Sequence, residues 1–287
     1  MLSQDIINEA VLRALQEDAP TGDITSESLI PESATATAQL RAREAGIFSG
    51  GQVFAAAFTL VDPSVHIKVL AEDGARMKAG QLLAEVSGSA RSVLRAERIG
   101  LNFAQRMSGI ATLTAQYVDA IAGTNARILD TRKTTPGLRA FERAAVVAGG
   151  GVNHRLNLSD AVLAKDNHLA VLTAGGKDLA TELQRVRAQV GPDIKIEVEV
   201  DRIDQIAPVL AGGVDIIMLD NFTLDQLREG VALVAGRAVV EASGNVRLDT
   251  VRAIAQTGVD VISVGALTHS ARALDLGLDI SLEVAAQ

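Results

Sequence analysis

Short apolar segments alternate with helical segments from residue 127 onward, and this alternation limits the possible folds more than any other feature. Six stretches have the length and apolar character of buried strands: 127–130, 161–164, 194–200, 214–219, 238–241 and 259–264. Helical patterns such as 178–189, 224–234 and 248–257 lie between several of them. Such alternation is typical of parallel strands joined by crossover helices, in either a barrel or an open sheet.

Polar and glycine-rich residues follow nearly every one of these strands at its C-terminal end, and this favours a barrel. The strand endings are Asp130–Lys133, Lys165–His168, Glu197 with Glu199, Asp220–Asn221, Ser243–Asn245 and Ser263–Gly265. In βα barrels the catalytic groups gather at that rim, and the last strands commonly supply a phosphate site. We therefore predict one site there. A Rossmann dinucleotide site is disfavoured, because no Gly-x-Gly-x-x-Gly motif follows the first strand.

Residues 131–168 form a basic island in a chain whose formal net charge is −8. A solvated helix face is the usual explanation of a charge run. Here glycines and turn residues interrupt the charges and no helical face emerges, which favours a pocket for a polyanion. The Lys and Arg residues of this window are Arg132, Lys133, Arg139, Arg143, Arg155 and Lys165.

Two carboxylates share one face of the 194–200 strand, Glu197 and Glu199. Either one could form a structural ion pair with Lys165 or Lys195. Alternatively, Glu199 and Asp220 could hold sugar hydroxyls or a Mg²⁺ ion, which prefers oxygen ligands. At the last strands, Ser243–Asn245 and Ser263–Gly265 lack bulky side chains where backbone N–H groups can reach a phosphate.

Composition narrows the class of protein. The 287 residues are enough for one large domain or two smaller ones, and 48% hydrophobic with 22% charged residues indicates a folded globular protein. The absence of cysteine excludes disulfides, thiolate zinc sites and a cysteine nucleophile. The negative charge argues against nucleic-acid binding. No signal peptide or membrane-spanning run is recognisable, so we expect a cytoplasmic enzyme of small molecules.

The region before residue 127 has a different order of expected helices and strands. A helix is expected after Ser3, strands are expected between residues 35 and 86, and a longer helix is expected from Ser92 to about Gly109. On that second helix a polar stripe recurs at helical spacing; its members are Arg91, Arg95, Arg98 and Asn102. By default such a stripe is a solvated face, and contact with a ligand is the alternative.

Motifs along most of the chain resemble the quinolinate phosphoribosyltransferase family, also called nicotinate-nucleotide pyrophosphorylase (carboxylating). The motifs are Gly22–Thr25, Ala96–Arg98, Ser108–Thr112, Thr131–Arg139, Gly149–Arg155, Lys165–His168, Leu219–Asn221, Glu241–Gly244 and Ile262–Ser270. The resemblance implies an N-terminal α/β layer domain at 1–112, with 272–287 packed back on it, and an incomplete α/β barrel at 113–271. It also implies a homodimer with shared active sites.

The activity implied by the resemblance joins quinolinate to phosphoribosyl pyrophosphate with Mg²⁺, and releases pyrophosphate, CO₂ and nicotinate mononucleotide. The positions matching the quinolinate site are Arg98 (donated by the partner subunit), Thr131, Arg132, Lys133, His154, Arg155 and Lys165. Those matching the phosphoribosyl pyrophosphate site are Glu199, Asp220, Ser243, Gly244, Asn245, Ser263, Val264 and Gly265. Of these, Lys133, Lys165, Glu199 and Asp220 are the expected catalytic residues, and Glu199 and Asp220 the expected metal ligands.

Two alternatives stay open at this point. One is a relative with the same fold and another substrate, such as the phosphoribosyltransferase-like protein found with molybdate transport systems. The other is a non-catalytic module that binds a phosphorylated metabolite. The intact basic set from Arg98 to Lys165, together with Glu199 and Asp220, argues against both.

Overall fold

The computed structural model describes residues 2–284 and divides into two compact units. The first unit takes the chain up to residue 115, then 135–150, and then the segment from 270 on. The second unit takes 116–134 and 151–269. Residues 135–150, which the sequence had assigned to the barrel domain, thus cluster with the first unit.

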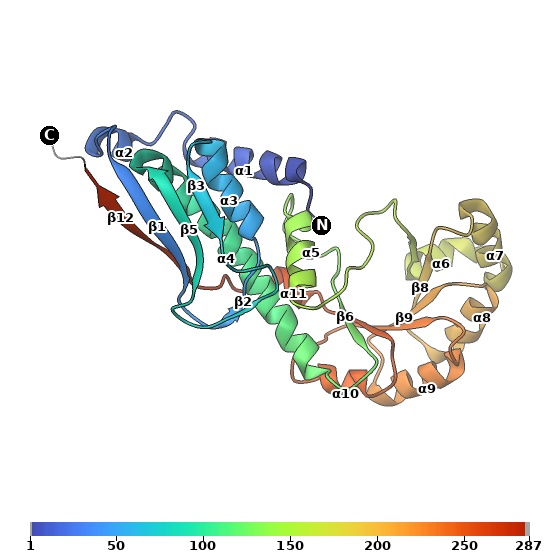
Figure 1. The fold of residues 1–287 in the computed structure, drawn as a ribbon. Helices are drawn as coiled ribbons and strands as arrows, with labels where there is room; N and C mark the ends of the chain where they lie inside the picture. The colour runs from blue at the N-terminus through green and yellow to red at the C-terminus, as the bar shows by residue number, and fades with distance from the viewer. Residues whose placement is uncertain (1, 285–287) are drawn as a thin grey trace. The chain divides into compact units, whose positions relative to one another are not determined.

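The first unit is built on a four-stranded antiparallel sheet (Figure 1). Its strands, in spatial order, are β12 (Leu276–Glu283), β1 (Thr35–Ala42), β5 (Leu82–Ser89) and β3 (His66–Val69). β12 comes from the far end of the chain and pairs with β1 over its whole length. A small ladder of β2 (Gly46–Ile47) and β4 (Arg76–Met77) completes the strands, and the helices are α1 (Gln4–Asp18), α2 (Ile24–Leu29), α3 (Gly51–Val61), α4 (Ala90–Ala120) and α5 (Arg139–Ala148).

Alternation in the sequence explains the orientation of this sheet. In β1 the buried positions Ala36, Ala38 and Leu40 alternate with more exposed neighbours, so one face of the strand packs on the core. Helix α1 begins after Ser3, whose side chain accepts a hydrogen bond from the N–H of Ile6. α4 is longer than expected, and its last residues, from Gln116 on, belong to the second unit.

The second unit is a parallel six-stranded sheet in the order β6-β11-β10-β9-β8-β7. The strands are β6 (Arg127–Leu129), β7 (Val162–Ala164), β8 (Ile196–Val200), β9 (Ile216–Asp220), β10 (Val239–Ser243) and β11 (Val261–Ser263). All six expected strands are therefore present. A parallel bridge between Leu129 and Val152 extends the sheet beside β6. The predicted fold class is confirmed: an antiparallel α/β layer plus an incomplete α/β barrel.

Helices cover the outside of this parallel sheet, as Figure 1 shows for α7–α10. They are α6 (Asp166–Leu172), α7 (Leu179–Val190), α8 (Ile206–Ala211), α9 (Leu224–Val234), α10 (Val251–Ala255) and α11 (Ala266–His269), with a 3₁₀ turn at Ile203–Gln205. In β8 the apolar residues Ile196, Val198 and Val200 are buried, and Glu197 between them is buried too. Both faces are thus covered, as expected of a parallel sheet. Within residues 2–284 we find no helix with the length and hydropathy that a membrane crossing requires.

Candidate active site

The C-terminal ends of the six parallel strands lie along one edge of the second unit's sheet. That edge brings together the predicted residues of six separate segments. Thr131–Lys133 follow β6, Lys165 follows β7, and Glu199 lies near the end of β8. Asp220 ends β9, Ser243 ends β10, and Gly265 follows β11.

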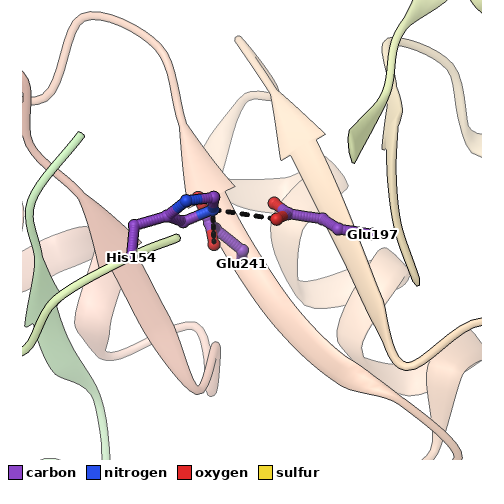
Figure 2. Close-up of side chains that lie close together, drawn as sticks. All are labelled: His154, Glu197 and Glu241. Atoms are coloured by element: carbon purple, nitrogen blue, oxygen red, sulfur yellow. Dashed lines mark hydrogen bonds and ion pairs between the residues drawn. The ribbon is translucent and has the colours of Figure 1, made fainter. Parts of the chain in front are cut away.

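A buried cluster of His154, Glu197 and Glu241 occupies the interior of this unit (Figure 2). Nε2 of His154 lies 2.8 Å from Oε2 of Glu197 and 3.9 Å from Oε2 of Glu241. The structural alternative, in which Glu197 pairs with Lys165 or Lys195, is not what the structure shows, because Glu197 pairs with His154. The backbone N–H of His154 donates to the buried carboxylate of Asp130 at 2.6 Å, which fixes the start of the loop after the Val152 bridge.

The charges in this cluster shift one another's protonation. Burial alone lowers the pKa of His154, but the hydrogen bond with Glu197 and the charges of Glu197 and Glu241 outweigh it and raise the pKa. Burial, followed by the charge of Glu197, raises the pKa of Glu241 to about 8. His154 is therefore biased toward the imidazolium and Glu241 toward the neutral acid at pH 7.

The hydroxyl of Ser263 donates to Oε1 of Glu241, so this side chain is engaged inside the barrel. The N–H of Val264 donates to the carbonyl of Leu129 at 2.9 Å. Both were predicted to contact a phosphate, and these bonds leave neither the Ser263 hydroxyl hydrogen nor the Val264 N–H for that purpose. Of the Ser263–Gly265 segment, Gly265 is the residue nearest the rim.

The basic residues of the loop after β6 lie close to those after Val152. Burial, and then the charge of Arg132, lowers the pKa of Arg155, so the two guanidinium groups are near neighbours. Nε of Arg132 is buried and has no hydrogen-bond partner among residues 2–284. The Lys133 carbonyl accepts a bond of 2.6 Å from the hydroxyl of Thr268, and Thr131 accepts one from the Lys133 N–H, which together hold the loop.

Lys165 and Glu199 form an ion pair, with Nζ 2.6 Å from Oε2. The pairing of Glu199 with a lysine is thus present in the structure, and it joins the ends of β7 and β8 at the rim. His168 has a structural position: its Nδ1 accepts the N–H of Lys165 at 3.1 Å and so caps helix α6.

Asp220, Asn221 and Asn245 form a hydrogen-bonded chain across the ends of β9 and β10. Nδ2 of Asn221 donates to Asp220 at 2.7 Å, and Nδ2 of Asn245 donates to Oδ1 of Asn221 at 3.2 Å. Asn221 and Asn245 both have positive φ, at 58° and 49°, and Gly244 has φ of 98°. A Cβ atom on Gly244 would lie 2.2 Å from Oδ1 of Asn221, so this approach requires glycine.

The polar stripe of α4 divides into structural and exposed members. Arg91 donates to the carbonyls of Ile30 and Glu27, and Arg95 donates to the carbonyl of Ala19. Arg98 is exposed and has no hydrogen bond or ion pair within the described part of the chain. Arg98 belongs to the first unit.

Four residues that bear on the site had been given no substrate, metal or catalytic role: Glu197, Glu241, Asp130 and Asn221. Glu241 and Asn221 lie inside motifs that the sequence analysis quoted, and Asp130 begins the first strand ending. For the acids, the available signal was a carboxylate within or directly after an apolar strand, since a buried carboxylate needs a partner. The sequence does not show which partner that is.

Two family models match the chain in succession. "Quinolinate phosphoribosyl transferase, N-terminal domain" matches residues 23–108, and the corresponding C-terminal domain matches 110–279. The nicotinate-nucleotide pyrophosphorylase [carboxylating] of Mycobacterium leprae is 43% identical over 282 residues, covering 96% of this chain and 98% of the relative. The mitochondrial quinolinate phosphoribosyltransferase [decarboxylating] 2b of Nicotiana tabacum is 42% identical, covering 97% and 83%.

Solved structures agree with these relatives. The crystal structure of NadC from Streptococcus pyogenes superposes with a TM-score of 0.93 at 39% identity, covering 99% of both chains. The nicotinate-nucleotide pyrophosphorylase of Francisella tularensis superposes with a TM-score of 0.92 at 38% identity, covering 98% of both chains. Neither a molybdate-system protein nor a non-catalytic module is favoured by these relatives.

Proposed function

The chain belongs to the quinolinate phosphoribosyltransferase family, and from that membership we propose that it makes nicotinate mononucleotide for NAD biosynthesis. The substrates are quinolinate and phosphoribosyl pyrophosphate, and the other products are pyrophosphate and CO₂. One observation carries this proposal: Lys133 and Lys165, after β6 and β7, share one sheet edge with the acids Glu199 and Asp220 on β8 and β9. This combination suits a dicarboxylate and a sugar phosphate bound side by side.

In this proposal the basic set binds quinolinate. Two adjacent carboxylates carry two negative charges at neutral pH, and an arginine fork can meet a carboxylate with two bonds. The buried, unpartnered Nε of Arg132 supports this assignment. Arg155, whose pKa is lowered by burial and then by the charge of Arg132, and His154, adjacent to it in the sequence, add charge. Thr131, Lys133 and Lys165 complete the set at the ends of β6 and β7.

Glu199 and Asp220 are proposed to hold the ribose hydroxyls and Mg²⁺. They suit the ion because they offer carboxylate oxygens at the ends of two adjacent strands, and Mg²⁺ needs only one or two carboxylates besides water and phosphate oxygens. When bound, Mg²⁺ neutralises charge on the departing pyrophosphate. The phosphate of the ribose is assigned to the loop at Ser243–Asn245 and to Gly265, because the Ser263 hydroxyl and the Val264 N–H already bond inside the barrel.

The chemistry then follows from positioning and charge. The pyridine nitrogen forms a bond to C1 of the ribose while the bond from C1 to the pyrophosphate oxygen breaks. The ribose becomes oxocarbenium-like as that bond breaks, and nearby carboxylates such as Glu199 stabilise it. Afterwards the bond between the ring carbon beside the nitrogen and its carboxylate carbon breaks and CO₂ leaves. The electron pair stays on that ring carbon, where the adjacent pyridinium nitrogen stabilises it, and the carbon then takes up a proton from water.

Arg98 is proposed to complete the quinolinate site from the partner subunit of a homodimer. Its exposure, and the absence of a partner for it within the described residues, support that role. A cytoplasmic location is part of the same proposal, and a chain without cysteine suits a reducing compartment.

One assay tests the function. The purified protein is incubated with quinolinate, phosphoribosyl pyrophosphate and Mg²⁺, and the release of CO₂ and nicotinate mononucleotide is followed together. Equal amounts of both products are expected. Nicotinate replaces quinolinate in a parallel reaction as the control for decarboxylation. If neither substrate turns over, the proposed enzyme activity is wrong.

A further inference from the structure

Glu241 is a buried acid that the proposed reaction leaves without a role. It lies in the middle of β10, and its side chain is 0% exposed. A buried carboxyl group costs several kcal/mol unless it is partnered, so its position calls for an explanation. Its Oε1 accepts the hydroxyl of Ser263 from the adjacent strand β11, and its Oε2 lies 3.9 Å from Nε2 of His154.

Two carboxyl groups therefore flank one ring nitrogen, with Glu197 at 2.8 Å from the same Nε2 (Figure 2). Only Glu197 is at hydrogen-bond distance, and a carboxylate oxygen only accepts, so this contact selects a proton on Nε2, whereas Glu241 at 3.9 Å interacts with the ring through space. One imidazolium neutralises one carboxylate. The second acid, buried and in the same cluster, avoids an uncompensated charge by keeping its own proton, as in other carboxyl pairs that share a site.

We infer that Glu241, held by Ser263, is a positioning residue that acts as a neutral acid: with Glu197 it fixes the imidazole ring of His154 and keeps Nε2 protonated. His154 then presents an oriented positive charge to a dicarboxylate. The identity of that ligand rests on the proposed function, whereas the state of the ring does not. The charged groups around His154 are Glu197 on β8, Glu241 on β10, Asp130 after β6, and the basic Arg155 with its neighbour Arg132.

The protonation equilibria agree with this geometry. The pKa of Glu241 is raised to about 8 by burial and by the charge of Glu197. The hydrogen bond from Ser263 acts the other way and lowers it. At pH 7 these shifts favour the imidazolium form of His154 and the neutral acid form of Glu241.

The test is a pH titration of the histidine ring signals by NMR in the full-length protein. The chain has only four histidines, so His154 can be assigned by substitution. In the parent, the His154 signals should move in a step near pH 8 as Glu241 loses its proton. Glu241→Gln should abolish that step, and Ser263→Ala should move it to higher pH because a hydrogen bond to the carboxylate is lost. A step near pH 8 that persists in Glu241→Gln would overturn the inference.

Steady-state kinetics provide the second readout at pH 7. Glu241→Ala should raise the KM for quinolinate by about tenfold and leave that for phosphoribosyl pyrophosphate unchanged. Glu241→Gln should restore the parental KM, because an amide keeps the shape and neutrality of the acid. An equal rise of the KM for quinolinate in Glu241→Ala and Glu241→Gln would contradict a neutral Glu241.

A matched control is Asp215→Asn. Asp215 precedes β9 at the opposite end of the strands, where it pairs with Lys195 and Arg187. Asp215→Asn should lower the melting temperature. It should leave the pH of the His154 step and the KM values for both substrates unchanged. If Glu241→Ala does not fold, the NMR titrations of Glu241→Gln and Ser263→Ala decide. Those titrations need no turnover, so a failure of the proposed function remains distinguishable from a failure of this inference.

Discussion

Nε2 of His154 lies 2.8 Å from Oε2 of Glu197, although 43 positions separate the two residues in the sequence. His154 follows the Val152 bridge beside β6, at one edge of the parallel sheet, and Glu197 lies on β8, next to the other edge. Four strands separate them in the sheet order. The contact therefore requires the sheet to curve into a barrel whose interior the two side chains share. His154 belongs to the proposed quinolinate site.

Substitution of Arg132 should weaken quinolinate binding selectively. Its buried Nε has no partner among residues 2–284, so a substrate carboxylate is the expected acceptor. Arg132→Ala should raise the Kd for quinolinate, measured by calorimetry, by about tenfold to a hundredfold. Arg237→Ala is the control, because Arg237 donates to the carbonyl of Val234 at the end of α9. Normal quinolinate affinity in Arg132→Ala would refute the assigned role.

Substitution of Glu199 should impair catalysis far more than stability. The side chains of Lys165 and Glu199 are 47% and 17% exposed, and an ion pair of this kind contributes about 1 kcal/mol or less to folding. Glu199→Gln should nevertheless lower kcat by about a hundredfold, because the carboxylate charge faces the developing oxocarbenium ion. Glu182→Gln removes a comparable ion pair with Arg185 on α7 and should leave kcat unchanged. Equal kcat values for the two variants would count against the assignment.

Gly244→Ala should disturb the proposed phosphate loop. The added Cβ would meet Oδ1 of Asn221 at 2.2 Å, in a residue whose φ is already 98°. We expect a higher KM for phosphoribosyl pyrophosphate, an unchanged Kd for quinolinate, and a loss of about 1–3 kcal/mol in the free energy of unfolding. Gly236→Ala separates strain from contact, because Gly236 also has positive φ but a methyl group there would meet nothing within 4 Å. A similar KM in both variants would argue against a phosphate at Gly244.

Mixing two inactive variants should restore activity if Arg98 serves the partner subunit. Arg98→Ala and Lys165→Ala should each be inactive alone. After mixed refolding, half of the dimers are heterodimers with one intact site, so about a quarter of the parental activity should return. A fully active monomer, or no recovery after verified heterodimer formation, would exclude this role.

Glu241→Gln should change the pH dependence of stability in a defined direction. The folded protein raises the pKa of Glu241 from 4.5 to about 8, so the acid form is favoured by folding. Its contribution is fully present below pH 4.5 and is lost as the pH rises through about 8. Relative to the parent, Glu241→Gln should therefore gain stability between pH 5 and pH 8.5, on the order of a few kcal/mol. Denaturant unfolding at pH 5 and pH 8.5 measures the free energy of unfolding of both proteins. If the variant and the parent differ by the same amount at the two pH values, Glu241 does not titrate in this range.

The sequence alone determined the architecture and the edge of the sheet to which we assign the proposed site. Hydrophobic periodicity is a local property, so the six strands could be placed from apolar runs and turn residues. Because these strands are parallel, their C-terminal ends had to share one edge, and Glu199 and Asp220 could be expected on neighbouring strands. The family resemblance followed from motifs along most of the chain, and the matching family models confirm it.

Only the tertiary structure decided which side chains meet across the barrel and which members of a stripe are structural. Periodicity assigns Glu197 to a face, but the residue opposite it depends on the curvature and register of the whole sheet, which no local pattern records. In the same way, Arg95 differs from Arg98 because the carbonyl of Ala19, distant in sequence, lies beside it. Long-range contacts are set by packing, and packing is a property of the complete fold.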